Sequence, residues 1–411
     1  MARAILHSDM NAFYVSVEMM LNPELKGKAV AVCGSTENRH GIVLAKSELA
    51  KKAGVKTGMV NWEARQVCPN LIMVPPQYEQ YLKYSKLAHE IYYRYTDLVE
   101  PFGMDECWLD ITGSKVYGTP SQIAEKIRKA TREELGLTVS IGVSFNKIFA
   151  KLGSDMKKPD AITEITEDNF KEKVWPLPAS DLLYVGPATE RKLSRIGIQK
   201  IGDLARLSPN LLKNMFGVKG LDLWAYANGK DESRVMHKDF VSPVKSIGHG
   251  ITCAADLEND EEVWRVILEL TQDISHKLRL HSLVARTVQV SVRDKSLGVR
   301  QFQCRLPFLT QLPDEIAKTA FRAFRENYKW ASSVRSITVR AIELQSRNIP
   351  RQYSLFEDES KIEARERLQD TIEDIRRRFG KHSIINASVM GDLKLPAKRD
   401  HEVIIPGAMY R

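Results

Sequence analysis

Two apolar segments of the chain carry carboxylates where a solvated strand would not need them. The first, ILHSDMNAFYVSVE, contains Asp9, and the second, PFGMDECWLDITG, contains Asp105, Glu106 and Asp110. A carboxylate beside buried apolar residues is costly to desolvate unless a partner compensates its charge. A hard divalent cation is one such partner, because Mg²⁺ prefers one or two carboxylates together with substrate phosphates. Bringing Asp9 next to Asp105 and Glu106 would make a site for two metal ions, which activate an attacking hydroxyl and neutralise a leaving pyrophosphate.

The same spacing also permits a purely structural role for these acids. Asp105 and Glu106 are adjacent, and adjacent residues of a regular strand point to opposite faces of the sheet. Both carboxylates can reach one metal only if the strand bends or ends at this point. Asp110 is expected to be a structural acid near the end of the strand.

The elements that must position these acids lie in a first block that extends to about residue 174. Residues 29–32 and 42–44 are strand-like runs bounded by glycines. Apolar residues at helical spacing predict a long helix over residues 80–98. A second helix is predicted over residues 121–135, with Ser121 as its N-cap and Gly136 as its stop.

Three further blocks follow. Residues 175–236 are helical with glycine breaks, and a polar linker follows near residues 237–243. The next block predicts strand, helix, strand, strand, helix and strand, an order typical of a small open sheet with two helices on one face. The predicted strands are 245–252, 287–293, 301–306 and 334–344, and the predicted helices are 260–281 and 313–328.

The last block contains a charged helix whose apolar residues form one stripe. We expect this stripe to pack on the chain itself or on a partner helix. Its members are Leu368, Ile372, Ile375 and Phe379.

Composition indicates a multidomain soluble protein. The 411 residues are too many for one compact core, and no apolar run is long enough to span a membrane. The N-terminus lacks the apolar run of a signal peptide, so a cytoplasmic location is expected. The five cysteines form no CxxC pair, which favours buried free thiols over disulfides or a zinc site.

The net charge of +9 is distributed unevenly along the chain. Residues 1–172 are balanced, residues 173–345 carry a net charge of +7, and the remainder carries +2. A balanced first part followed by a basic middle suits a catalytic core joined to a region that binds a polyanion.

Three motifs, in this order, resemble those of the Y-family translesion DNA polymerases. ILHSDMNAFYVSVE is similar to the opening motif, MDECWLDIT to the second acidic motif, and IGVSFNKIFAKLGSDMKKP to the lysine-rich segment that follows. The resemblance covers roughly residues 1–345. It implies an α+β right-hand polymerase with palm, fingers, helical thumb and a βαββαβ little-finger domain. The implied boundaries are 1–12 and 78–174 for the palm, 13–77 for the fingers, 175–236 for the thumb, 237–244 for a linker, 245–345 for the little finger and 346–411 for a C-terminal tail.

The resemblance assigns roles to residues of the active site. Asp9, Asp105 and Glu106 match the catalytic acids, which bind two Mg²⁺ ions together with the backbone carbonyl of Met10. The implied nucleotide-binding residues are Phe13, Tyr14, Lys51 and Lys158. Tyr14 matches a steric gate, an aromatic ring that would clash with a ribose hydroxyl. Core packing is the alternative for both aromatic residues and suits Phe13 better.

Three positions depart from the commonest pattern of the family. Asn11 stands where a second aspartate is usual, but that residue is not a central metal ligand, so activity should survive. Glu48 and Lys51 stand where a tyrosine and an arginine usually hold the triphosphate. Lys51 can still bind phosphate as a point charge. Glu48 would repel phosphate, and we expect it to turn away, toward Lys52.

Two further lysines of the lysine-rich segment have two possible roles. Lys147 and Lys151 either serve the phosphates or are simply solvated.

Two regions are expected to hold DNA. Residues 183–207, with VGPAT and GIQKIGDL, resemble a helix-hairpin-helix in which Gly186 lies at a turn whose backbone amides bind a phosphate. Cations along one face of the little-finger sheet could follow a phosphate backbone, although an ordinary solvated face is the alternative. These cations are Lys245, Arg286, Arg293, Arg300, Arg305, Arg335 and Arg340, with Lys295 in the adjoining turn.

The tail begins with a short motif that resembles the bacterial sliding-clamp-binding peptide. Gln352 is followed by Leu355 and Phe356, a pair that fills a hydrophobic pocket of the clamp. Docking of this pair on the protein itself is the alternative. Residues 371–391 resemble the tail of UmuC-like members and place the chain in a DinB/UmuC-like bacterial branch.

The function implied is low-fidelity DNA synthesis past damaged template, from deoxynucleoside triphosphates and primer-template DNA, in DNA repair and the mutagenic SOS response. Proofreading is not expected, because no second acidic cluster is visible, and a monomer is the default. Three alternatives differ in class: a nucleotidyl cyclase with the same acid pair, a non-catalytic clamp-bound adaptor, and a plain DNA-binding module. The basic regions argue against the cyclase, and the intact acids argue against the other two.

Overall fold

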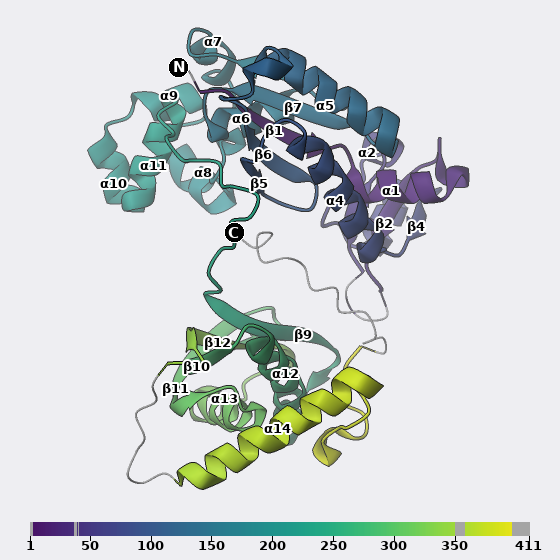
Figure 1. The fold of residues 1–411 in the computed structure, drawn as a ribbon, viewed down its shortest axis with the longest axis vertical. Coiled ribbons are helices and arrows are strands. Elements are labelled where there is room, and N and C mark those ends of the chain that lie inside the picture. The colour runs from purple at the N-terminus through teal and green to yellow at the C-terminus, as the bar shows by residue number, and fades with distance from the viewer. Residues whose placement is uncertain (1–2, 37–38, 40, 350–357, 397–411) are drawn as a thin grey trace. The chain divides into compact units, whose positions relative to one another are not determined.

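The computed structural model describes residues 3–36, 39, 41–349 and 358–396. They fold into two compact units (Figure 1). The first unit comprises mainly residues 3–34 and 42–242, and the second mainly residues 243–396. Among the described residues, no helix has the length and apolar character needed to cross a membrane.

A five-stranded sheet forms the centre of the first unit. Its strands are β1 (Ile5–Met10), β5 (Val99–Pro101), β6 (Glu106–Asp110), β7 (Val139–Ser144) and β8 (Ile162–Ile165), in the order β5-β6-β1-β7-β8. Strand β1 is antiparallel to both of its neighbours, β6 and β7. All six residues of β1 are buried, as expected for a central strand covered on both faces.

Helices α4 (Tyr78–Tyr93) and α5 (Pro120–Leu135) cover one face of this sheet. The N-cap of α5 is Thr119 rather than the predicted Ser121, because Thr119 and Gln122 form a reciprocal capping box ahead of Pro120. Gly136 ends the helix in the left-handed conformation, as predicted. Helix α4 is shorter than predicted, since the chain leaves the helix after Tyr93 and turns into β5.

Helix α6 (Lys147–Met156) covers the opposite face at unusually close range. A Cβ atom added to Gly142 of β7 would lie 1.9 Å from the carbonyl oxygen of Ala150 and 2.6 Å from the amide nitrogen of Ser154. On the helix side, Gly153 faces the Cα atom of Gly142. The two glycines therefore let the backbone of α6 lie directly on the sheet.

The rest of the first unit consists of a small sheet and short helices. Strands β2 (Val30–Cys33), β3 (Val43–Lys46) and β4 (Ile72–Val74) pair in the order β3-β2-β4, close to the predicted positions of the first two. The helices are α1 (Phe13–Leu21), α2 (Glu48–Lys52), α3 (Asn61–Val67), α7 (Phe170–Val174), α8 (Pro187–Ser194), α9 (Ile201–Arg206), α10 (Pro209–Phe216) and α11 (Val218–Ala227), with 3-10 turns η1 (Pro23–Leu25), η2 (Lys115–Tyr117) and η3 (Ala179–Asp181).

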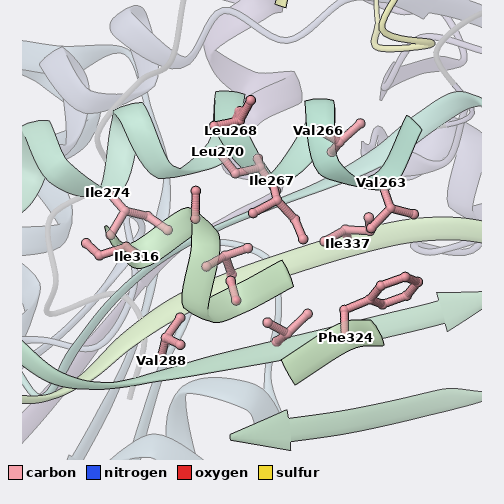
Figure 2. Packing of buried hydrophobic residues seen from close by; sticks show 14 of the residues in the cluster. Val263, Val266, Ile267, Leu268, Leu270, Ile274, Val288, Ile316, Phe324 and Ile337 are labelled. Carbon is pink, nitrogen blue, oxygen red and sulfur yellow. The ribbon is translucent and has the colours of Figure 1, made fainter. Parts of the chain in front are cut away.

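The second unit has the predicted order of elements. Strands β9 (Ser246–Leu257), β10 (Leu283–Asp294), β11 (Val299–Thr310) and β12 (Val334–Ser346) form an antiparallel sheet in the order β11-β10-β12-β9. Helices α12 (Asp260–Leu280) and α13 (Pro313–Asn327) pack against each other and against the sheet. Their apolar residues and the inward residues of the strands form one core, part of which is drawn in Figure 2.

Helix α14 (Glu359–Phe379) and the segment after it, with the 3-10 turn η4 (Ala387–Val389), dock on this second unit. The contacts of α14 are largely ionic: Arg347 pairs with Glu366 and Asp370, and His276 pairs with Glu373 at 2.7 Å. The predicted apolar stripe packs on this unit only in part, because Ile372 and Ile375 are half-buried whereas Leu368 and Phe379 at its two ends are 61% and 74% exposed. Four of the five cysteines are buried and all five are free, as predicted.

Candidate active site

The register of the central sheet brings the predicted acids together. Asp9 on β1 lies directly opposite Glu106 on β6, and the two side chains share one face of the sheet. Asp105 precedes β6, in the bend formed by residues 102–105, and its carbonyl oxygen accepts a hydrogen bond from the amide of Met10 at 2.9 Å. The strand thus begins at Glu106, which meets the condition under which both adjacent acids can serve one site.

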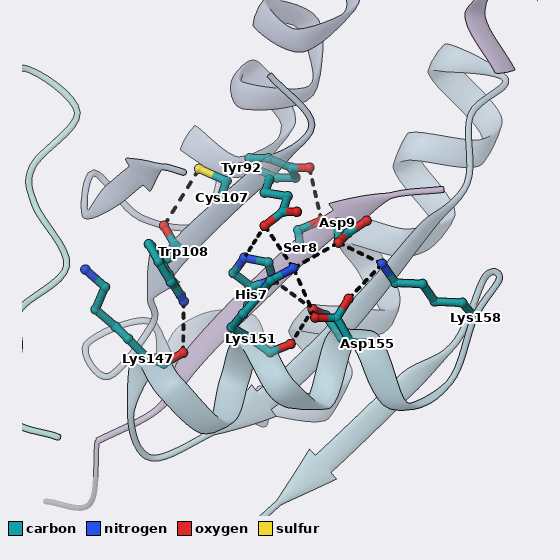
Figure 3. A network of polar contacts seen from close by, with 12 residues as sticks. His7, Ser8, Asp9, Tyr92, Cys107, Trp108, Lys147, Lys151, Asp155 and Lys158 are labelled. Carbon is teal, nitrogen blue, oxygen red and sulfur yellow. Dashed lines mark hydrogen bonds and ion pairs between the residues drawn. The ribbon is translucent and has the colours of Figure 1, made fainter. Parts of the chain in front are cut away.

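Two lysines from the opposite side of the site neutralise these acids (Figure 3). Lys151 on α6 lies 3.3 Å from Asp9 and 2.9 Å from Glu106. Lys158, which follows α6, lies 2.8 Å from Asp9. Asp155 contacts both ammonium groups, Lys151 at 3.1 Å and Lys158 at 2.9 Å. The site is therefore a network of ion pairs between three carboxylates and two ammonium groups, with Asp105 next to it in the chain.

The close carboxylates perturb one another's titration. Burial and the negative charges of Asp9 and Glu106 raise the pKa of Asp105 to about 7. Burial acts in the same direction on Glu106, but contact with His7 and the charge of Lys151 outweigh it and lower the pKa of Glu106 to about 2. Burial lowers the pKa of His7, so the imidazole is neutral at pH 7.

The carboxylates of Asp9, Asp105 and Glu106 suit a divalent cation that arrives together with a phosphate substrate. Within the described ranges, no three His, Cys, Asp or Glu side chains are grouped as a ready-made metal cage. Mg²⁺ rarely uses such a cage and takes one or two carboxylates plus substrate oxygens. Burial is the main cause of the raised pKa of Asp105, and the charges of Asp9 and Glu106 add to it, so a bound cation would stabilise the ionised carboxylate.

The two predicted aromatic residues differ in burial. Phe13, the first residue of α1, is 3% exposed and belongs to the core between the sheet and α4. Tyr14 is half-buried and its ring stacks on Tyr81 of α4, with ring centroids 4.2 Å apart and planes 9° apart. Its hydroxyl lies 3.5 Å from the sulfur of Met104, the residue before Asp105. Tyr14 therefore lies beside the acid cluster, whereas Phe13 is a core residue.

The residues that depart from the family pattern have clear local roles. Glu48 pairs with Lys51 at 3.7 Å rather than turning toward Lys52 as predicted, because the i,i+3 positions of α2 face each other. Both side chains are more than half exposed. Asn11 donates to Ser140 and accepts from the amide of Asp160, so its amide fastens the loop that carries Lys158.

The structure also places Lys147, Lys151 and Asp110. Lys147 is neither solvated nor near the acids, since its ammonium group is buried against Glu100 at 2.8 Å and over the ring of Trp108. Lys151 is not solvated either. Asp110 is a structural acid, as expected, because it ends β6 and accepts a hydrogen bond from the amide of Thr112.

Sequence reasoning missed two members of the site. His7 lies 3.5 Å from Glu106 through one ring nitrogen and 2.9 Å from the hydroxyl of Ser154 through the other. Its position two residues before Asp9 on a strand places it on the same face as that acid, which was a usable signal. Asp155 is four residues after Lys151 and three before Lys158, and this spacing could also have indicated the ion pairs.

The predicted cations of the second unit are distributed over two faces of its sheet. Arg340 and Arg293 are exposed on the face opposite the helices, in register with Gln289 and Ser336. The expectation of one shared face fails for Arg300, which pairs with the buried Val292 and whose guanidinium lies over the ring of Tyr328. Arg286 and Arg335 lie at irregularities of register, and Lys245 is exposed just before β9.

On the face of the sheet opposite the helices, Gly248 of strand β9 leaves room for the side chain of Arg340. A Cβ atom on Gly248 would lie 3.1 Å from both Cβ and Cγ of Arg340, so the arginine side chain extends over the glycine.

The remaining predicted binding residues lie in two places. Gly186 is exposed at the N-cap of α8, which is joined to α9 by a short turn. Gln352, Leu355 and Phe356 lie outside the described residues.

Comparison with known proteins agrees with this geometry. Residues 8–155 match the impB/mucB/samB family, and residues 244–355 match the impB/mucB/samB family C-terminal domain. The chain is 47% identical to a DNA polymerase IV of Acetivibrio thermocellus over 95% of this chain and 98% of that protein. It is 36% identical to DNA polymerase IV 2 of Bacillus subtilis, over 94% of each.

Among solved structures, a Y-family DNA polymerase chimera matches with a TM-score of 0.74 and 25% identity, covering 84% of this chain and 99% of that one. The two family domains and the relatives that match almost end to end extend over both compact units. The chain therefore belongs to the impB/mucB/samB family and has the fold of a Y-family DNA polymerase.

Proposed function

We propose that this protein is a DNA-directed DNA polymerase that extends a primer past damaged template without proofreading. The observation that carries the proposal is the convergence of Asp9, Asp105 and Glu106 at the end of the central sheet. Support also comes from the relatives named DNA polymerase IV, which match the chain almost end to end. In this proposal the central sheet is the palm, β2–β4 with their helices the fingers, α8–α11 the thumb, and the second unit the little finger.

The acids would hold two Mg²⁺ ions, with the backbone carbonyl of Met10 as a further ligand. When bound, the ions supply charge neutralisation and activation of the primer 3′-hydroxyl. The chain's own contribution is to fix the acids. Asp9 and Glu106 are held by strand pairing, and Asp105 stands in the bend before Glu106, close enough for the three charges to interact.

The two lysines of the site would act on the triphosphate. Lys158 reaches Asp9 from outside the sheet and is about one-third exposed, so its ammonium group can bind a phosphate oxygen that arrives above the acids. Lys151 is more buried and stays close to the carboxylates. Lys51 adds a positive charge from α2, although its neighbour Glu48 offsets part of it.

The proposed DNA contacts come from backbone amides and arginines. The exposed N-terminus of α8 at Gly186 offers amides to a phosphate. On the second unit, Arg293, Arg305 and Arg340 are exposed on the face that the helices leave uncovered. Cations spread along such a face follow a phosphate backbone without reading bases.

The proposal includes a partner. The segment with Gln352, Leu355 and Phe356 would bind the bacterial sliding clamp as an extended peptide. Leu355→Ala combined with Phe356→Ala should abolish capture by purified clamp and leave synthesis on short primed templates unchanged. Retention of clamp binding by this variant would contradict the assignment.

Primer extension on a primed template, with Mg²⁺ and four deoxynucleoside triphosphates, tests the proposed activity. Wild-type protein should extend the primer, and Asp105→Ala combined with Glu106→Ala should reduce extension by at least ~1000-fold. Asp110→Asn is the matched control, because it removes a charge from the same strand at the end remote from the site. This control should retain extension.

The outcomes separate the competing classes. Wild-type protein that fails to extend, even with the clamp present, would favour a non-catalytic adaptor. Extension that survives removal of both acids would show that the active site lies elsewhere. A template carrying an abasic site, compared with the undamaged template, then tests the translesion part of the proposal.

A further inference from the structure

The ring of Tyr14 is held in place by a layered aromatic cluster. It stacks on Tyr81 with centroids 4.2 Å apart and planes 9° apart, the nearly parallel geometry that fixes ring orientation. Tyr78 meets the ring of Tyr14 edge-on, with centroids 6.0 Å apart and planes 86° apart. Tyr78 also meets Tyr81 edge-on. Two neighbours on α4 thus define both the plane and the lateral position of the Tyr14 ring.

Tyr81 is itself fixed by a buried carboxylate. Its side chain is fully buried, and its hydroxyl donates to Glu18 at 2.5 Å. The second oxygen of Glu18 accepts from the side-chain amide of Gln77 at 2.7 Å. Glu18 is 4% exposed, and a buried carboxylate is retained only where hydrogen bonds compensate its desolvation. The three side chains therefore form a closed unit with little freedom to rotate.

The carboxylate that anchors Tyr81 belongs to α1, the helix that also carries Tyr14. Glu18 and Tyr14 are four residues apart on α1, so they lie on the same face of that helix. Tyr14 and Glu18 both contact Tyr81, one through its ring and the other through its hydroxyl. A shift of Tyr81 would therefore be transmitted to the ring of Tyr14, whose hydroxyl lies against Met104 beside the catalytic acids.

We propose that Tyr81, anchored by Glu18, is a positioning residue for sugar discrimination: it holds the Tyr14 ring at the depth where a ribose 2′-hydroxyl would clash. The inference rests on the proposed polymerase function and on the gate role of Tyr14. Neither Tyr81 nor Glu18 touches the reacting groups. A steric gate discriminates only as well as its ring resists displacement, because a ring free to move would yield to the extra hydroxyl.

Single-nucleotide insertion with matched ribo- and deoxyribonucleotides tests this inference. The readout is the ratio of kcat/KM for deoxyribonucleotide to that for ribonucleotide, which does not depend on the fraction of folded enzyme. Tyr81→Leu, which removes the stacked ring, should lower the ratio by roughly threefold to tenfold, the range that corresponds to the energy of an aromatic pair. Tyr81→Phe keeps the ring but loses the anchor, and should lower it less.

Tyr92→Phe provides the matched control. Tyr92 is a buried tyrosine on the same helix, and its hydroxyl bonds to Ser8, away from Tyr14. Its replacement removes a buried phenol hydrogen bond of α4 and should leave the ratio unchanged.

Each outcome bears on a separate claim. Loss of discrimination in Tyr81→Leu with an unchanged ratio in Tyr92→Phe would support the inference. An unchanged ratio in Tyr81→Leu, when Tyr14→Ala has lost discrimination, would overturn it and leave the gate intact. An unchanged ratio in Tyr14→Ala would overturn the gate assignment itself. Absence of any insertion by the wild-type protein would overturn the proposed function and this inference with it.

Discussion

Replacing Gly142 by alanine is expected to destabilise the first unit by about 3 kcal/mol or more, at or above the upper end of the usual cost of overpacking. The new Cβ atom would lie 1.9 Å from the carbonyl oxygen of Ala150, well inside the 3.4 Å at which ordinary contact begins. The obstacle is the backbone of α6, so no side chain can rotate away to make space. Either α6 retreats from the sheet or the unit loses its native packing.

The assay is thermal unfolding, followed by calorimetry. For a unit of this size, such a loss lowers the unfolding temperature by roughly 6 to 12 °C. Gly113→Ala is the matched control, because a Cβ atom there meets nothing within 4 Å and Gly113 does not need a positive φ. A Gly142→Ala protein that unfolds within about 1 °C of this control would refute the close approach of α6. Primer extension should fall in parallel, since α6 carries Lys151.

Three further substitutions test the ion pairs of Asp155, Lys147 and Asp273. Asp155→Asn should raise the Mg²⁺ concentration for half-maximal synthesis by roughly fivefold, because it removes two partly exposed ion pairs, worth about 1 kcal/mol, that draw Lys151 and Lys158 away from the acids. Mn²⁺ binding should weaken in calorimetry, and a loss of rate with no such shift would contradict this prediction. Lys147→Met should cost about 3–5 kcal/mol by removing the ion pair that Lys147 makes with the buried Glu100, and adding Glu100→Gln should restore part of this stability in denaturant unfolding. Burial alone would raise the pKa of Asp273, but His249 and Lys381 outweigh it and lower that pKa to about 2. The stability linked to Asp273 is therefore present above about pH 4 and lost as the pH falls toward 2, and Lys381→Met should flatten this loss in acid unfolding curves.

The acids could be singled out locally, because each lies within a short apolar run of the sequence. That Asp9 meets Glu106 depends on the pairing of two distant strands, which only the resemblance to a known family implied. The secondary structure of the second unit was likewise predictable from alternating and helical periodicities. The capping residue of α5 was placed two residues late, because Ser121 and Thr119 are both good N-caps and only the geometry of Pro120 and Gln122 chooses between them.

Other features depend on contacts between distant residues and could not be predicted. The face on which Arg300 lies follows from its register with Val292, and a strand offers either face until its partner is known. The docking face of α14 follows from the positions of partners such as Arg347 and His276, so the apolar stripe from Leu368 to Phe379 alone could not define it. The burial of Lys147 depends on Glu100, which lies 47 residues away in the chain.

The ion pairs that Lys151 and Lys158 make with the acids are expected to make folding independent of the metal ions proposed for this site. Many metal centres hold carboxylates that repel one another until the ion arrives, and such proteins unfold when the ion is chelated. Here the ammonium groups already offset part of the repulsion, because they pair with Asp9 and Glu106. A chelator should therefore stop synthesis while leaving the unfolding temperature unchanged. Under the proposed function, the polypeptide would reach its native state without the cation, and the cation would be required only for the chemistry.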